Sequence, residues 1–222
     1  MFYEESTKIC AEKYAEHIEI RDENVMLNCS HYFSRATQMT LSNRFDKSAE
    51  HLPIILKSII PVRQLTSLII EHQCNFSMQQ IIHLLNVMPN INILEFNWNF
   101  RVIDNLTQIQ QSQVFKNVAK SNKISHLIVD GVCSFEIMKT FILLCPEIKH
   151  LTLQAMSTTE YKEKIQFLIS NKQAILSKLC LLHLNTFYHH RMIHSFETLV
   201  NTSDIFWDCS HKIIGNDFYI CL

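Results

Sequence analysis

The stretch LLCPEIKHLTL, residues 143–153, decides the fold class of this chain. An apolar run stops at Cys145-Pro146, and a second apolar pattern then places Ile148, Leu151 and Leu153 three and then two residues apart. Proline lacks a backbone N–H and does little harm where a helix ends, whereas a spacing of two is typical of a strand. The stretch therefore predicts the end of a helix followed by the start of a strand.

The same apolar spacing recurs along the chain. The triplets are Ala36-Met39-Leu41, Leu65-Leu68-Ile70, Ile91-Leu94-Phe96, Ile124-Leu127-Val129, Ile148-Leu151-Leu153 and Leu179-Leu182-Leu184. The middle residues stand at positions 39, 68, 94, 127, 151 and 182, so the steps between them are 29, 26, 33, 24 and 31 residues. One triplet proves nothing in so apolar a chain, but the nearly regular step indicates a repeated unit.

Helices are predicted between the triplets, where the apolar period changes from 2 to about 3.6 residues. The predicted helices cover residues 77–88, 135–145, 161–176 and 191–200. Ser77 and Gln80 form the S-x-x-Q pattern of a capping box, and Ser134 is a candidate N-cap. The unit is therefore strand, loop, helix and turn. An ordinary α/β domain with a doubly wound sheet is the alternative, because it also alternates strands and helices.

Two of these junctions resemble the cysteine-type leucine-rich repeats of F-box proteins. The segments LCPEIKHLTL (144–153) and VMPNINILEF (87–96) are similar to the helix-end, Cys/Met-Pro, x-L-x-x-L-x-L junction of those repeats. The resemblance covers roughly residues 33 to 185. It implies an α/β leucine-rich-repeat solenoid, which is a curved parallel sheet with outer helices, built here from about six irregular repeats.

The resemblance also implies a function. It predicts a non-enzymatic protein-recognition module that serves as the substrate-binding arm of an F-box-type ubiquitin-ligase receptor. A cullin-ligase adaptor would then be a partner if an F-box lies upstream. The F-box itself is not recognisable in the sequence. A free-standing leucine-rich-repeat scaffold or inhibitor, unrelated to ubiquitin, is therefore the alternative.

The chain divides into three predicted segments. Residues 1–32 are expected to form an N-terminal helical cap, because residues 6–20 have the pattern of an amphipathic helix. Residues 33–203 hold the leucine-rich repeats. Residues 204–222 are expected to form a C-terminal strand or hairpin cap around Gly215-Asn216. Both caps would cover the apolar edges that the ends of a repeat array otherwise expose.

Composition excludes several classes of function. The 20 basic and 21 acidic residues nearly balance, so no electrostatic footprint indicates nucleic acid or a membrane surface. Only two glycines are present, which is too few for phosphate-binding loops or nucleophile elbows. The eight cysteines include no CxxC pair, and the N-terminus lacks the apolar core of a signal peptide. We therefore expect reduced thiols and a location in the cytoplasm, or in the nucleus.

A binding face is predicted from the strands. Residues that alternate with the apolar anchors project from the face of the sheet opposite the helices. We expect a protein or peptide partner to bind there without a cofactor or metal, whereas a merely solvated sheet face is the alternative. The candidate residues are Glu71, Ile93, Glu95, Asn97, His126, Ile128, Asp130, His150, Thr152, Gln154, His183 and Asn185.

Histidines offer the other candidate chemistry. His190 and His194 in HHRMIH form an i, i+4 pair that can hold a metal on a helix, with His189 beside them, but no third ligand or HExxH glutamate accompanies them. Surface histidines are the alternative. His126 and His150 occupy equivalent positions in neighbouring units and are expected to lie together. No Cys–His spacing singles out a nucleophile, so we predict no enzyme, and a small α/β enzyme is the least favoured alternative.

Overall fold

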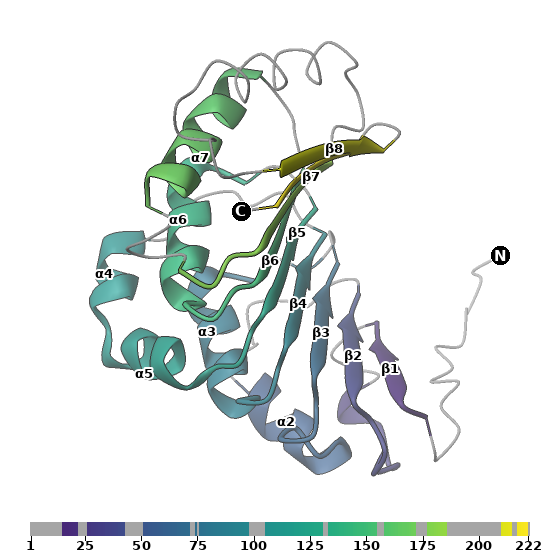
Figure 1. Cartoon of the computed structure of the whole chain (residues 1–222). Coiled ribbons are helices and arrows are strands. Elements are labelled where there is room, and N and C mark those ends of the chain that lie inside the picture. The colour runs from purple at the N-terminus through teal and green to yellow at the C-terminus, as the bar shows by residue number, and fades with distance from the viewer. Residues whose placement is uncertain are drawn as a thin grey trace, which may run out of the picture.

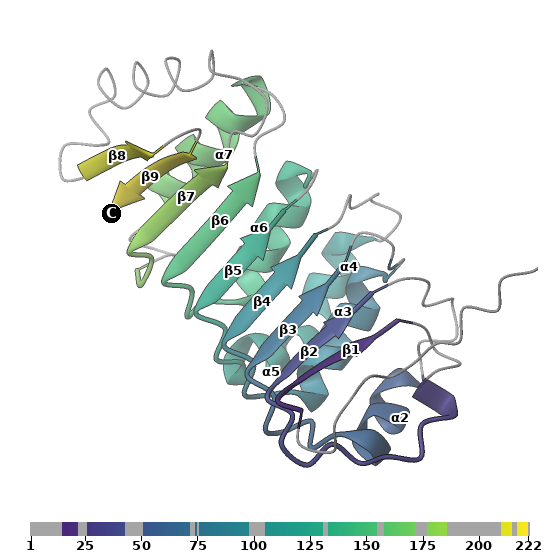
Figure 2. The same ribbon diagram turned by 90° about the vertical axis from the view of Figure 1, so that its right-hand side faces the viewer.

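The computed structural model shows a mixed α/β fold. It describes residues 15–21, 26–42, 51–71, 74, 76–97, 105–130, 133–154, 158–171, 177–185, 210–214 and 217–221. In these residues a nine-stranded, mostly parallel sheet is combined with six α-helices. The sheet is open and does not close into a barrel, and all the labelled helices lie on one side of it (Figures 1 and 2).

The parallel strands follow one another in chain order. The parallel strands are β1 (His17–Ile20), β2 (Gln38–Leu41), β3 (Ser67–Ile70), β4 (Ile93–Phe96), β5 (His126–Val129), β6 (His150–Gln154) and β7 (Leu181–Asn185). A doubly wound sheet reverses its strand order and carries helices on both faces. Neither feature occurs among the described elements, so the doubly wound alternative is wrong.

The C-terminal strands are antiparallel. β8 (Ser210–Ile214) and β9 (Asp217–Cys221) form a hairpin within the segment for which a strand or hairpin was predicted. β9 also pairs antiparallel with β7, which gives the order β1-β2-β3-β4-β5-β6-β7-β9-β8. The hairpin therefore extends the sheet beyond its last parallel strand, as Figure 2 shows.

Helices cover one face of the sheet. They are α2 (Leu52–Ile59), α3 (Met78–Val87), α4 (Leu106–Gln111), α5 (Gln113–Ser121), α6 (Phe135–Leu144) and α7 (Thr158–Ser170). The capping box of α3 is confirmed: the Gln80 backbone N–H donates to Ser77 Oγ over 3.2 Å, and the Ser77 N–H donates to Gln80 Oε1 over 2.8 Å. Ser134 caps α6 in the predicted way. Within the described ranges, none of the helices combines the length and apolar character that crossing a bilayer requires.

The middle residues of the six apolar triplets lie in one row across the sheet. Each is the Cα partner of the next in the neighbouring strand, and all are almost completely buried against the helices. The row consists of Met39, Leu68, Leu94, Leu127, Leu151 and Leu182. Burying one such side chain contributes about 1.5–3 kcal/mol. The predicted spacing of the triplets therefore corresponds to the register of the sheet.

A backbone hydrogen-bond pattern repeats at every step from β1 to β7. Ahead of each strand, one carbonyl oxygen accepts two successive N–H groups of the next unit; Ser125 O, for example, accepts from Lys149 at 2.8 Å and from His150 at 2.9 Å. The same double acceptance occurs at the carbonyls of Glu16, Thr37, Thr66, Asn92, Ser125 and Lys149. The units therefore share one backbone geometry, although their lengths differ.

A buried asparagine joins two of the helices to the sheet. Asn122 is 6 % exposed, and its Nδ2 donates to the carbonyls of Val118 at 2.8 Å and Leu144 at 2.7 Å. Its Oδ1 accepts from the Ile124 N–H at 3.2 Å. These bonds connect the ends of α5 and α6 to the segment that leads into β5. Every polar group of this buried side chain therefore has a partner on its own chain.

The N-terminal part of the fold differs from the prediction. His17–Ile20, which fall in the predicted helical cap, form the strand β1, so the parallel part of the sheet has seven strands. Ile18 and Ile20 are buried while His17 and Glu19 are exposed, and this period of two suits pairing with β2. Residues 1–14, and the helix predicted at 191–200, lie outside the described residues.

Candidate functional site

The face of the sheet opposite the helices is the candidate site, and we call it the open face. Figure 2 looks onto its strands, with the labelled helices behind them. All of the predicted site residues alternate with buried anchors; Asp130 is exposed, and the other eleven are half-buried. They are Glu71, Ile93, Glu95, Asn97, His126, Ile128, Asp130, His150, Thr152, Gln154, His183 and Asn185. The parallel register brings these residues, spread over five strands, onto one surface.

The open face also extends onto strands that were not predicted to contribute to it. Tyr219 of β9 is the partner of His183, and Asp217 is the partner of Asn185. At the other edge, His17 and Glu19 of β1 continue the face beyond β2. The alternation in DFYIC and HIEI is the signal for these positions, but it does not say which strand lies beside them.

The N-terminal part of the open face is occupied by its own hydrogen bonds. The Thr40 hydroxyl lies 2.8 Å from His17 Nε2, and Ser42 Oγ donates to Glu19 Oε1 over 2.9 Å. Glu19 also pairs with Arg21 at 3.1 Å, and the hydrogen bonds from Arg21 and then Ser42 hold the pKa of Glu19 below its usual value. Since Thr40 and Ser42 are each only 5 % exposed, this part of the face offers few groups to a ligand.

The centre of the open face carries unpaired carboxylates. Glu71 and Asp130 follow the ends of β3 and β5, and Glu95 lies in β4 between them. Within the described residues none of the three forms an ion pair. Asn97, just beyond β4, has a buried side-chain oxygen with no hydrogen-bond partner. Within the described part of the chain, the centre therefore holds carboxylate and amide oxygens that no ion pair or hydrogen bond satisfies.

Two histidines lie beside this acidic centre. The rings of His126 and His150, in the neighbouring strands β5 and β6, are edge-to-face with their centroids 4.2 Å apart, as the repeat spacing predicted. Ser125 Oγ lies 2.8 Å from His126 Nδ1. Burial, followed by the positive charges of His150 and Lys149, lowers the pKa of His126. Protonating His126 is therefore less favourable in the folded protein than in the unfolded chain.

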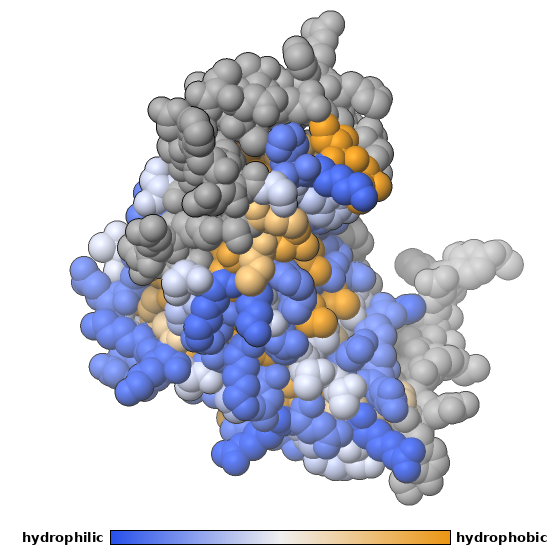
Figure 3. Space-filling view, viewed as in Figure 1, coloured by the Kyte–Doolittle hydropathy of each residue, from blue (hydrophilic) through white to orange (hydrophobic). Residues whose placement is uncertain are grey.

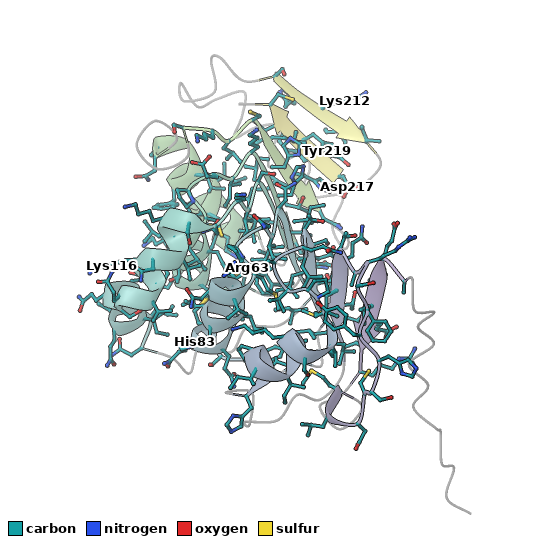
Figure 4. The ribbon with its side chains drawn as sticks, turned by 90° about the horizontal axis from the view of Figure 1, so that it is seen from below. Arg63, His83, Lys116, Lys212, Asp217 and Tyr219 are labelled. Atoms are coloured by element: carbon teal, nitrogen blue, oxygen red, sulfur yellow. The ribbon has the colours of Figure 1, made fainter. Side chains whose placement is uncertain are left out.

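A third group forms where the hairpin joins the parallel strands. The His183 ring stacks on Tyr219 with centroids 4.4 Å apart and an angle of 2° between the planes. Its Nδ1 lies 3.4 Å from Thr152 Oγ1, whereas Asp217 Oδ1 lies 3.5 Å from Nε2, which is buried and makes no hydrogen bond. At this distance Asp217 and His183 are in electrostatic contact without a hydrogen bond. Figure 4 shows Tyr219 and Asp217 together with Lys212 on the hairpin, away from His83 and Lys116 on the helices.

Potential metal ligands and buried thiols are the remaining reactive groups in the described part of the chain. No group of three or more His, Cys, Asp or Glu residues is close enough there to hold a metal ion. Burial raises the pKa of the Cys74 thiol to about 12 and also raises that of Cys145, so neither is a ready nucleophile. The candidate metal ligands His189, His190 and His194 lie outside the described residues.

The helix side of the molecule has a different surface. Figure 3 shows mostly hydrophilic residues at the lower left, where α4 and α5 lie. The hydrophobic patch at the upper right lies over β8, the last strand of the sheet, and not over the helices. The exposed apolar side chains Ile54 and Leu143 belong to two different helices, α2 and α6. Scattered apolar side chains of this kind are common on protein surfaces and need no ligand.

No protein-family model matches the chain, and a search of curated proteins finds no significant similarity. The functional proposal therefore has to rest on the residues of this chain and on their arrangement.

Proposed function

We propose that this chain is a leucine-rich-repeat solenoid whose open face binds another protein without catalysing a reaction. The sequential parallel strands, the helices on one side and the double hydrogen-bond acceptance at each step support the repeat architecture. Solenoids of stacked repeats use such extended faces for recognition. The described cysteines are free thiols, which supports a place of action in the cytoplasm or nucleus.

The observation that carries the proposal is a difference within the open face. The polar side chains of its N-terminal part are hydrogen-bonded within the chain, and those of its centre, in the part of the chain that the structure describes, are not. Polar side chains of the N-terminal strands form hydrogen bonds with one another. Within the described residues, the side-chain oxygens of the central group have no partner on the chain; this group is Glu71, Glu95, Asn97 and Asp130. Half-buried isoleucines lie among them. Because the sheet holds these side chains in register, little ordering is needed when a partner binds.

The size of the open face limits the kind of partner. From β3 to β9 there are five inter-strand gaps of about 4.8 Å, which gives a width of roughly 24 Å. Three residues along the strands add about 10 Å, so the patch is on the order of 240 Å². A standard protein interface buries about 800 Å² on each partner. The patch therefore suits a peptide segment, or a folded partner that also contacts other parts of the chain.

The cysteine-type junctions support a more specific role. They favour the substrate-binding arm of an F-box-type ubiquitin-ligase receptor, in which the open face would select the protein to be modified. A free-standing scaffold or inhibitor uses the same face and needs no ligase. The two roles differ in one partner, because only the first requires a cullin-ligase adaptor.

Affinity purification of the tagged protein from cells that express it tests the proposal, with bound proteins identified by mass spectrometry. The open-face variant carries Ile93→Arg and Ile128→Arg. The matched control carries Ile54→Arg and Leu143→Arg, which place the same charges on exposed helix positions. We expect the wild type and the control to capture the same proteins, and the open-face variant to lose them at least about tenfold, as buried anchors of an interface do.

Each outcome has a clear meaning once circular dichroism shows that all three proteins are folded. Equal capture by the open-face variant would move the binding site off this face. Recovery of the cullin-ligase adaptor would support the ligase role and make the remaining proteins candidate substrates. Specific partners without any ligase component would favour the scaffold or inhibitor.

A further inference from the structure

The carboxylates of the open face surround one strand end. Glu95 is the Cα partner of Ile69 in β3 and of Ile128 in β5, and Asn97 lies two residues further along the same strand. Glu71 and Asp130 flank Asn97 at the ends of the neighbouring strands. Since parallel strands are about 4.8 Å apart, Glu71 and Asp130 are separated by roughly 10 Å across Asn97.

None of the Lys and Arg residues in the described ranges forms an ion pair with these three carboxylates. The ion pairs of Lys and Arg residues there are made elsewhere: Arg21 with Glu19, Lys139 with Glu136 and Lys178 with Glu147. Three like charges at this spacing repel one another, and the half-buried positions of Glu71 and Glu95 weaken screening by solvent. A positive charge placed among them would relieve that repulsion.

Asn97 gives an independent indication of a missing donor. Its side-chain oxygen is buried and makes no hydrogen bond, whereas buried polar atoms in proteins almost always have a partner. Lys and Arg side chains carry donors and no acceptors, so they complement both the amide oxygen and the carboxylates. The carboxylates and the amide oxygen at this strand end are therefore all complemented by a hydrogen-bond donor, such as the N–H groups of Lys or Arg.

Aliphatic side chains line the same area. Ile69, Ile93 and Ile128 are half-buried on the open face, on three successive strands. They form an apolar surface next to the acidic groups. The aliphatic stems of Lys and Arg, or Leu, Ile and Val residues, can pack on such a surface while the charged ends reach the carboxylates.

We propose that the open face binds a cationic, aliphatic segment of a partner protein. Lys or Arg side chains of that segment face Glu71, Glu95 and Asp130, and aliphatic side chains cover the three isoleucines. The proposal rests on the proposed function, namely that the open face binds protein, and it specifies the chemistry of the partner. Acidic segments and nucleic acid are excluded because they would add negative charge to an unpaired negative cluster.

Selection of displayed random peptides tests this chemistry directly. Peptides of about twelve residues are long enough to cross the roughly 24 Å patch in an extended conformation. Three immobilised proteins are compared: the wild type, the charge-reversal variant Glu95→Lys with Asp130→Lys, and the control variant Glu136→Lys with Glu163→Lys. The control makes the same change in net charge at exposed positions of α6 and α7.

We expect the wild type and the control to enrich peptides that combine Lys or Arg with aliphatic residues, and the charge-reversal variant not to enrich them. A synthetic copy of one selected peptide should bind the charge-reversal variant about tenfold or more weakly than the wild type, as is typical for close charge pairs. Its affinity for the wild type should fall as salt is raised. Replacing its Lys and Arg residues by Glu should restore binding to the charge-reversal variant.

Selection of neutral or acidic peptides by the wild type, enrichment of the same cationic peptides by the charge-reversal variant, or equal affinity for all three proteins would overturn the proposal. If circular dichroism shows that the charge-reversal variant is unfolded, Glu95→Gln with Asp130→Asn takes its place, and the same loss of cationic peptides is expected. Failure here differs from failure of the proposed function. Loss of native partners in the Ile93→Arg and Ile128→Arg variant, with no cationic peptides selected, would keep the binding face and reject only this partner chemistry.

Discussion

Leu151 and Thr152 are neighbours in β6, yet they belong to two surfaces with opposite properties. Leu151 points to the helices and is 1 % exposed, whereas Thr152 is half-buried on the open face beside His183. The helix-covered face is completed by the chain itself, including its buried polar groups. On the open face, the Asn97 oxygen has no hydrogen-bond partner among the described residues, and several isoleucine side chains are only half-buried. The two faces of one strand therefore differ in how completely the described part of the chain covers and satisfies them.

Two asparagines make the same contrast. Asn122, on the helix side, satisfies its amide with three hydrogen bonds to the backbone of its own chain. Asn97, on the open face, keeps a buried oxygen without a partner. A buried polar atom without a hydrogen-bond partner destabilises the folded state, and such atoms are typical of functional sites.

The two faces are expected to differ most in how much free energy of unfolding is lost when a charged residue is introduced. Leu151→Asp should lower the free energy of unfolding by more than about 4 kcal/mol and prevent stable folding, because an unpaired carboxylate is buried among apolar side chains. Thr152→Asp, one residue further on, should change it by less than about 1 kcal/mol. Thermal unfolding followed by circular dichroism measures both. Equal stability of the two variants would show that the assignment of the faces is wrong.

A smaller difference is expected for the two asparagines. Asn122→Ala leaves the Leu144 carbonyl and the Ile124 N–H without the side-chain partners they have now, and should cost about 2–4 kcal/mol. Asn97→Ala removes an oxygen that has no partner, so its effect should stay within about 1 kcal/mol. Urea denaturation of both variants gives the comparison. A larger cost for Asn97→Ala would mean that its amide is satisfied in solution.

A still smaller loss of unfolding free energy is expected when the N-cap side chain of a helix is removed. Ser77→Ala removes the cap of α3 and should cost about 1 kcal/mol, because the Gln80 N–H loses its acceptor. His51→Ala, at the corresponding position of α2, should cost less than about 0.5 kcal/mol, because the His51 side chain makes no capping hydrogen bond. Midpoints of chemical denaturation measured side by side distinguish the two. A cost as large at His51 would show that something other than capping is measured.

The smallest effect is expected from the open-face histidines. The pKa of His126 lies below its ordinary value of 6.5, so the unfolded chain binds this proton more readily than the folded one. The free energy of unfolding should therefore decrease as the pH falls below about 6.5. His150→Gln should weaken this dependence only in part, because burial, rather than His150, is the largest cause of the lowered pKa. Titration of the His126 ring protons by NMR checks the direction, and a pKa above 6.5 would contradict it.

Much of the fold was accessible from local patterns. The apolar triplets predicted six strands and their common register, and Ser77 with Gln80 predicted a helix start. These features depend on residues within a few positions of one another. β1 was missed because HIEI is short and continues a pattern that also fits a helix. α4 and α5 were missed because their sequences are mostly polar: α4 buries no residue, and α5 buries only Phe115 and Val118.

The candidate site divides in the same way. Alternation along each strand placed Glu95, Asp130 and the other predicted residues on one face, and the repeat spacing predicted that His126 and His150 meet. It did not find Tyr219 and Asp217, because nothing near β9 in the sequence shows that this strand pairs with β7. The missing partner of Asn97 was also out of reach, since satisfaction of a buried atom is a property of everything packed around it.

By itself, the sequence determined the positions of six parallel strands and of the helices α3 and α6, together with the anchors that enter the core, because apolar period and capping are set by neighbours along the chain. The tertiary structure alone decided that the C-terminal hairpin pairs with β7 and so extends the open face, and that no ion pair of the described residues involves the carboxylates around Asn97. Those outcomes depend on distances between residues far apart in the sequence. Short-range patterns contain no measure of such distances.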